Sequence, residues 1–147
     1  AMEMGAIIAK VDDVEAKRIY NFGLNLGIAF QLQDDYLDTF GDVEIFGKQI
    51  GGDIAENKKT FLYLEALEVC SKADKEKLLN LYKSTDNNHK IREVTLLFEE
   101  NNIPEIIKSA IGFYTNLAFM ELKNLSISED RKNVLKNFGL GLMKRTI

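Results

Sequence analysis

The chain has few of the residues and patterns that mark several classes of protein. Its single cysteine, Cys70, cannot form a disulfide within the chain, and we expect it to be an inert core residue. One proline, one histidine and no tryptophan occur among the 147 residues. No apolar run approaches the roughly eighteen residues that a membrane-spanning helix needs. The net charge of −4 is built from mixed signs, which excludes an evident nucleic-acid partner or polybasic membrane surface.

What remains is a chain of helical pattern. No run alternates with a period of two for long enough to indicate a strand. Hydrophobic residues make up 46% of the chain, enough for one domain that buries very roughly two thirds of its unfolded surface. We therefore expect an all-α fold, an antiparallel helical bundle with residues 1–147 as a single domain, in a soluble, cytoplasmic protein without stable membrane insertion.

Capping residues predict where the helices begin and end. Asp12, with Glu15 three positions later, opens a long helix to residue 40, and Gly41 ends it as a residue free to adopt the left-handed conformation. Apolar spacing places Leu24, Ile28 and Leu32 toward the core. Another helix is expected from 53, with Lys58 in its second turn, to a break at 71–74. Further helices are expected at 75–83, from about 91 to 101, from about 104 to 125, and from 126, where Ser126 and Glu129 form a cap and Val134, Leu135, Phe138 and Leu142 face the core.

Three aspartates follow one another near the end of the long helix. Asp34 and Asp38 stand one turn apart on one face, with about 5–6 Å between their β-carbons, and Asp35 is turned about 100° away. Like charges at this spacing repel, so they are tolerated on a solvated face or where a cation neutralises them. Taken alone, the aspartates fit a solvated acidic face better than a metal site.

A glycine-rich stretch with two lysines comes next. With it, a metal site becomes the better interpretation of the aspartates than a solvated acidic face. Lys48 lies among Gly47, Gly51 and Gly52, where tight turns let backbone amides approach an anion, and Asp53 and Lys58 follow. Carboxylate oxygens suit Mg²⁺, which takes one or two protein carboxylates together with phosphate oxygens. Lysines meet the remaining phosphate charge. The stretch therefore predicts half of a site for a magnesium-bound diphosphate.

The ordered set resembles the second aspartate-rich region of the trans-isoprenyl diphosphate synthases, the polyprenyl synthetase family. The matching positions are Phe30, Gln31, Asp34, Asp35, Asp38, Gly47, Lys48, Gly51, Gly52, Asp53, Ile54, Lys58 and Thr60. The upstream stretch from Gly5 to Gln33 also resembles the family, and the likeness weakens toward the C-terminus.

The resemblance implies a role for each polar residue. Asp34 and Asp38 would ligate Mg²⁺, with Asp35 and Asp53 supporting them. Lys48 and Lys58 would be the catalytic cations, binding the allylic diphosphate as charge develops on its leaving oxygen. Phe30 and Gln31 would bind near the isopentenyl group.

The resemblance also implies an activity and partners. The protein would be a prenyltransferase that condenses an allylic diphosphate with isopentenyl diphosphate, and it would form a homodimer as family members usually do. Family members carry another DDxxD motif upstream, which these 147 residues lack. We therefore expect a C-terminal portion of a longer synthase that is inactive alone. Two alternatives stay open: a fragment of a terpene cyclase-like enzyme, and a non-catalytic helical dimerisation module.

Overall fold

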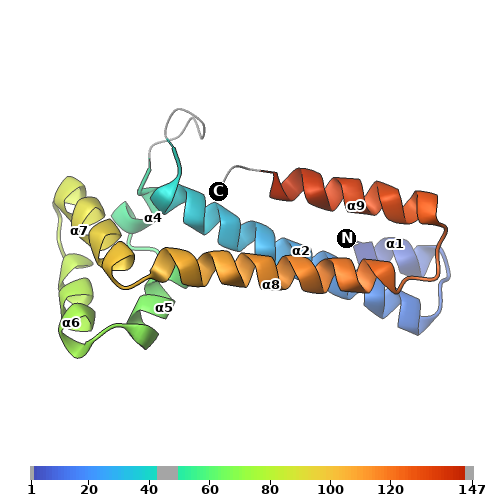
Figure 1. Cartoon of the computed structure of the whole chain (residues 1–147), viewed down its shortest axis with the longest axis horizontal. Helices are drawn as coiled ribbons and strands as arrows, with labels where there is room; N and C mark the ends of the chain where they lie inside the picture. Colours follow the sequence, from blue (N-terminus) through green and yellow to red (C-terminus); the bar gives the residue numbers. More distant parts are fainter. Residues whose placement is uncertain (1, 43–49, 145–147) are drawn as a thin grey trace. The chain divides into compact units, whose positions relative to one another are not determined.

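The chain folds entirely into helices over the residues that the structure describes. This computed structural model describes residues 2–42 and 50–144, and over these residues the backbone forms eight helices and no strand (Figure 1). The all-α prediction is confirmed. In chain order the helices are α1 (Met2–Ile8), α2 (Asp13–Phe40), α4 (Gly52–Ala55), α5 (Phe61–Val69), α6 (Lys72–Leu81), α7 (Asn87–Glu100), α8 (Ile103–Lys123) and α9 (Glu129–Met143).

The described residues divide into two compact units. The first contains residues 2–31 and 110–144, and the second contains residues 32–42 and 50–109. Helices α2 and α8 each contribute residues to both units. The expectation of a single domain stays a prediction. Within the part of the chain that the structure describes, no helix combines the length and the apolar content that crossing a lipid bilayer requires.

The core of the first unit forms between α2 and α8. Phe22 and Leu26 from α2 pack with Ala118 and Leu122 from α8, and Leu125 closes the cluster. Partly buried side chains surround it; they are Met2, Ile19, Phe119, Ile127, Leu135, Leu142 and Met143. Gly139 of α9 lets this helix approach closely, because a β-carbon there would lie 3.1 Å from the Phe119 ring.

Helix α2 begins as its sequence predicts. The Asp12 carboxylate accepts a hydrogen bond from the Glu15 amide at 2.9 Å, which satisfies one of the free N–H groups of the first turn. The Glu15 carboxylate is engaged elsewhere, since it accepts from the Ser126 amide at 2.8 Å. We expected Ser126 to cap the last helix, and this prediction is wrong. The cap position belongs to Ser128.

The buried face of α2 agrees only in part with the expected one. Leu32 is buried as expected and Ile28 is partly buried, but Leu24 is 45% exposed, and Phe22, Leu26 and Ala29 are buried as well. The expectation failed at Leu24 because apolar residues lie on more than one face of this helix, and periodicity alone cannot choose between them. In α9, Leu135 and Leu142 pack against the core as expected, whereas Val134 is 69% exposed and Phe138 is 51% exposed.

Glycine stands at the end of α2 for a different reason from the expected left-handed conformation. Gly41 does end the helix, but Gly51 is the one glycine with a left-handed backbone among the described residues. A β-carbon at position 41 would instead collide with the carbonyl oxygen of Leu37. Steric space, and not a positive φ angle, favours glycine here.

The expected helix from residue 53 to the break at 71 is two helices. Helix α4 stops at Ala55, and α5 starts at Phe61 after the cap residue Thr60. Asn57 takes the left-handed conformation (φ 57°), and its amide donates to the Ile54 carbonyl at 3.1 Å. The Lys58 amide donates to the Asp53 carbonyl at 2.9 Å, and together the two bonds form a Schellman cap. Lys58 therefore lies outside both helices, and not in a second helical turn.

The second unit buries apolar faces of its helices. Fully buried side chains come from four of them: Leu62 and Ala66 of α5, Leu78 of α6, Val94, Leu97 and Phe98 of α7, and Ile103 and Ile107 of α8. Figure 1 shows α7 between α4 and α6, and both of these helices contact it. Pro104 stands in the first turn of α8, as predicted.

The two faces of α2 predict different costs for the same substitution. Leu26→Ala removes a side chain that is 2% exposed and should lower the free energy of unfolding by about 2–5 kcal/mol. Leu24→Ala, at a half-exposed position, should lower it by less than about 1 kcal/mol. Urea denaturation of both variants would check this. Equal losses would contradict the observed orientation of α2.

Candidate diphosphate site

Asp34 and Asp38 lie where the spacing predicts, on one face of α2. The helix is continuous from Asp13 to Phe40, so the two carboxylates stand one turn apart. Both side chains are partly buried. They are thus neither sealed in the core nor fully surrounded by water.

Asp38 forms hydrogen bonds with the start of α4. Its carboxylate oxygen Oδ2 accepts a hydrogen bond from the Asp53 amide at 2.9 Å. Its backbone carbonyl accepts from the Gly51 amide at 2.6 Å. The first turn of a helix presents unpaired N–H groups and favours a nearby negative charge. Asp38 therefore fixes the start of α4, although it stands fifteen residues earlier in the chain.

The surroundings of Asp38 raise the pKa of its carboxyl. Burial raises the pKa of this carboxyl above its ordinary value, while the hydrogen bond from the Asp53 amide acts in the opposite direction. The negative charges of Asp53 and Asp34 also raise the pKa, and the positive charge of Lys58 lowers it. A cation placed beside this group would favour its charged form.

Asp53 and Lys58 form an ion pair next to that carboxylate. The Lys58 Nζ lies 2.6 Å from the Asp53 Oδ1 and 3.1 Å from the Glu56 Oε2. The hydrogen bond to Asp53, followed by that to Glu56, raises the pKa of the Lys58 ammonium above its ordinary value. The lysine side chain is exposed, so the pair faces solvent. Asp38, at the end of α2, is thus brought together with Asp53 and Lys58, which lie in and just after α4.

Asp35 occupies a different environment from its two neighbours. It is buried (7% exposed), and its Oδ2 accepts from the Phe61 amide at 3.4 Å, at the start of α5. This contact places a negative charge at a helix N-terminus, which is a stabilising arrangement. Its predicted supporting role at a metal ion stays a prediction.

Two further predicted positions belong to the other compact unit. Phe30 and Gln31 belong to α2 within the first compact unit, and Gln31 is exposed while Phe30 is partly buried. Their role near an isopentenyl group stays a prediction. Lys48 and Gly47 lie outside the described residues.

The turn before α4 requires glycine at one position. Gly51 has a φ angle of 83°, and a β-carbon there would lie 2.6 Å from the Ile91 Cγ2. The left-handed conformation and the contact with α7 both exclude a larger side chain. The sequence pattern predicted a tight turn here, but it gave no sign of the packing against Ile91.

A buried lysine next to Ile91 escaped the sequence analysis. Lys90 is 1% exposed, and its Nζ donates to the Ala55 carbonyl at 3.0 Å and to the Asn57 Oδ1 at 2.9 Å. It lies four and seven residues before Val94 and Leu97, on the apolar face of α7. The sequence did contain a signal for this burial, because Lys90 has the spacing of the apolar residues of α7. The signal was overlooked because the neighbouring Ile91 fits the same apolar pattern almost as well.

The donor chemistry of the acidic residues fits a hard divalent ion. Over the described residues, no group of three or more His, Cys, Asp or Glu side chains is arranged to hold a metal by itself. Mg²⁺ does not need such a group, since it is bound by one or two carboxylates together with substrate phosphates and water. Asp38 uses one carboxylate oxygen for the Asp53 amide, and a carboxylate has about four acceptor positions. It therefore keeps capacity for an ion.

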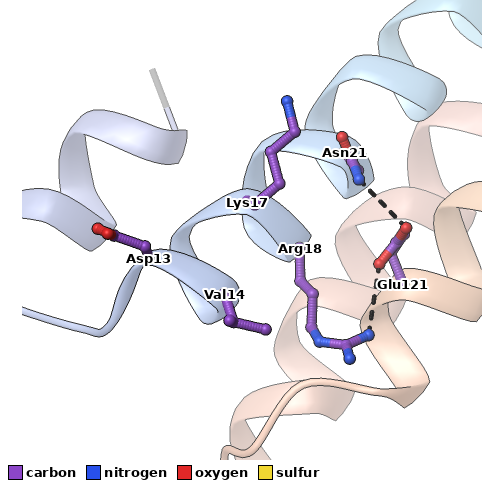
Figure 2. A pocket seen from close by; sticks show the side chains of 6 residues that line it. All are labelled: Asp13, Val14, Lys17, Arg18, Asn21 and Glu121. Carbon is purple, nitrogen blue, oxygen red and sulfur yellow. Dashed lines mark hydrogen bonds and ion pairs between the residues drawn. The ribbon is translucent and has the colours of Figure 1, made fainter.

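A separate hollow of about 400 Å³ lies in the first unit, and the contacts among its lining residues join two helices. It is lined by Asp13, Val14, Lys17, Arg18, Asn21 and Glu121 (Figure 2). Figure 2 shows Glu121 held from two sides: Asn21 Nδ2 donates to its Oε1 at 3.3 Å, and Arg18 Nη1 lies 3.7 Å from its Oε2. These contacts link α2 to α8, and the sequence analysis did not single them out.

Comparison with known proteins identifies what the chain resembles. The model of the polyprenyl synthetase family matches residues 1–99. The short chain isoprenyl diphosphate synthase of Methanothermobacter thermautotrophicus is 33% identical over 132 residues, which are 90% of this chain and 40% of that protein.

Solved structures agree with the sequence match. A crystal structure of a geranylgeranyl pyrophosphate synthase has a TM-score of 0.85 and 43% identity, covering 99% of this chain and 46% of that one. Another geranylgeranyl pyrophosphate synthase, from Corynebacterium glutamicum in complex with isoprenyl diphosphate and magnesium, has a TM-score of 0.79 and 28% identity, covering 97% of this chain and 41% of that one. The chain thus spans less than half the length of the relatives that it matches.

Gly51 provides a test of the turn that carries Asp53. Gly51→Ala should lower the free energy of unfolding by roughly 2–4 kcal/mol, because it adds left-handed strain and overlap with Ile91. Gly27→Ala is the matched control, since nothing lies within 4 Å of its added carbon and alanine favours a helix. It should leave stability unchanged or raise it by up to about 1 kcal/mol. Thermal denaturation would measure both, and a harmless Gly51→Ala would contradict the described turn.

Proposed function

Because this chain belongs to the polyprenyl synthetase family, we propose that it supplies the second aspartate-rich half of a site that binds a magnesium-complexed diphosphate. The whole protein would be a prenyltransferase that condenses an allylic diphosphate with isopentenyl diphosphate. The chain would contribute the acids and lysines on one side of that site.

One observation supports this proposal most strongly: acids and a lysine from distant positions converge. The Asp38 carboxylate lies against the Asp53 amide, and the Asp53 carboxylate lies against Lys58. A solvated acidic face would need no such link between the end of α2 and the turn after α4. The link leaves carboxylates and an ammonium side by side, which is the combination that a metal-bound phosphate requires.

Each residue has a proposed part in binding. Asp34 and Asp38 would hold the ion, with Asp35 and Asp53 supporting them. The ion, when bound, neutralises diphosphate charge and stabilises the leaving oxygen. Lys58 would donate to phosphate oxygens, since an ammonium has three donors and this one is exposed. Lys48, outside the described residues, would add a second cation, and Phe30 and Gln31 would border the isopentenyl group.

The same proposal covers assembly, location and the activity of the isolated chain. Large apolar side chains are exposed in α1, among them Met4, Ile7 and Ile8, and they support association into the homodimer that the sequence predicts. The whole protein would be located in the cytoplasm. The 147 residues carry one DDxxD motif, so we expect little or no turnover from this chain by itself.

Calorimetric titration of inorganic pyrophosphate into the chain with excess Mg²⁺ tests the half-site. The wild-type chain should bind, and omission of Mg²⁺ should abolish the signal. Asp38→Asn keeps an oxygen that can accept the Asp53 amide but removes the charge. It should weaken binding by about 10- to 100-fold, the range for loss of a charged ligand contact.

Glu100→Gln is the matched control for the loss of one negative charge. Glu100 is exposed at the end of α7, so its substitution should change the affinity by less than about twofold. Wild-type affinity in Asp38→Asn would contradict the proposed metal contact. Equal weakening in both variants would reduce the effect to net charge.

A steady-state assay tests the proposal about turnover. The chain, incubated with Mg²⁺, isopentenyl diphosphate and an allylic diphosphate, should form little or no longer prenyl diphosphate, because the upstream carboxylate cluster of the family is not among its 147 residues. The buffer without protein sets the baseline. Product formation at ordinary enzyme rates, on the order of 1 per second or faster, would show that one cluster suffices.

A further inference from the structure

We propose that Lys90 is a positioning residue of the diphosphate site, whose buried ammonium holds the Asn57 turn and so sets Lys58 against Asp53. This inference rests on the proposed function of that site. Lys90 itself faces away from solvent, so its part would be to fix the geometry of groups that bind the ligand.

The contacts of Lys90 converge on the end of α4. Its Nζ reaches the carbonyl of Ala55, the last residue of that helix, and the side-chain oxygen of Asn57, the residue with the left-handed backbone. Both acceptors are neutral oxygens. Burial of an ammonium is costly unless hydrogen bonds replace its water, so these two contacts are what permits the lysine to sit at 1% exposure.

The turn that Lys90 holds is one that the local sequence does not choose unaided. Capping and apolar spacing favour one helix from Asp53 onward, in which the Ala55 carbonyl would accept the amide of residue 59. In the structure Lys90 bonds to this carbonyl, and Asn57 takes a φ angle of 57°. Asparagine tolerates the left-handed conformation better than most residues, and the bond from Lys90 to the Asn57 side chain holds this residue in place.

The turn at Asn57 determines the direction of the Lys58 side chain. Asn57 is the left-handed residue of the Schellman cap, and the next amide, that of Lys58, donates back to the Asp53 carbonyl at 2.9 Å. This bond brings the two residues together, and their side chains then meet at 2.6 Å. If the helix continued past Ala55, this backbone bond would be lost and the two side chains would point in different directions.

One turn of α7 fixes both ends of α4. Ile91 packs where Gly51 enters the helix, and Lys90 bonds where the helix ends. Helix α4 has four residues, too few for stability of its own. Its geometry, and with it the spacing between Asp38, Asp53 and Lys58, is therefore set by α7 together with the bonds from Asp38.

Substitution of Lys90 tests the inference with a readout that does not depend on catalysis. In Lys90→Met a chain of similar length replaces the ammonium. By nuclear magnetic resonance of the free chain, the amide signals of Asn57 and Lys58 should move and those of α9 should stay. In the Mg²⁺ and pyrophosphate titration, this variant should bind at least tenfold more weakly than wild type.

Leu97→Ala separates positioning from general destabilisation. Leu97 is 1% exposed on the same helix, and its loss opens a cavity without removing a bond to α4. At a temperature where both variants are folded, Leu97→Ala should keep its affinity within twofold of wild type. Equal weakening by Leu97→Ala and Lys90→Met would overturn the inference.

Asn57→Gly provides a second test if Lys90→Met fails to fold. Glycine keeps the left-handed backbone accessible and removes one of the two acceptors. It should by itself weaken binding at least threefold relative to wild type; where Lys90→Met folds, Asn57→Gly should add nothing to it in the double variant. Full additivity, or wild-type affinity in Asn57→Gly, would overturn the inference.

The outcomes also distinguish this inference from the proposed function. If the wild-type chain does not bind pyrophosphate, the proposed half-site fails. The positioning role is then judged by the resonance data alone, which support it if Asn57 and Lys58 move and refute it if they do not. If wild type and Lys90→Met bind equally, the inference fails while the proposed function stands.

Discussion

The arrangement of the site depends on the carboxylate of Asp38 and its bond to the Asp53 amide. This contact spans fifteen residues and joins the end of a long, continuous helix to a helix of four residues. A short helix contributes little stability of its own, so its position must come from elsewhere. Asp38 fixes its start, Ile91 closes its entry turn, and Lys90 fixes its end. The consequence is a fixed row of acid, acid and ammonium at the end of α2.

The same row shows how structural and binding roles are divided among neighbouring aspartates. Asp35 is buried against the start of α5, whereas Asp38 is partly exposed beside the ion pair. Burial raises the pKa of the Asp38 carboxyl, which means that the charged form is held at a cost that a cation would relieve. Two of the three acids thus secure helices that follow them: Asp35 accepts from the start of α5 and Asp38 from the start of α4, while Asp38 is also one of the proposed metal ligands.

The sequence predicted the fold class correctly, but it did not predict several of the packing contacts around the acidic residues. The helix from Asp13 to Phe40 followed from one cap and one glycine, and the acids on it followed from its periodicity. The break after Ala55 was missed, because it depends on a lysine thirty-five residues away that no local pattern connects to it. The exposed position of Leu24 was missed for a similar reason, since several faces of α2 are apolar and only packing partners select among them. Contacts between distant segments decided each of these cases.

The most direct test of the central claim locates the metal ion. With Mn²⁺ in place of Mg²⁺ and pyrophosphate present, paramagnetic broadening of amide resonances reports which residues surround the ion. The account predicts that the strongest broadening centres on Asp34, Asp38 and Asp53 and disappears when pyrophosphate is omitted. Broadening centred elsewhere, such as at the hollow lined by Asp13 and Glu121, would contradict it.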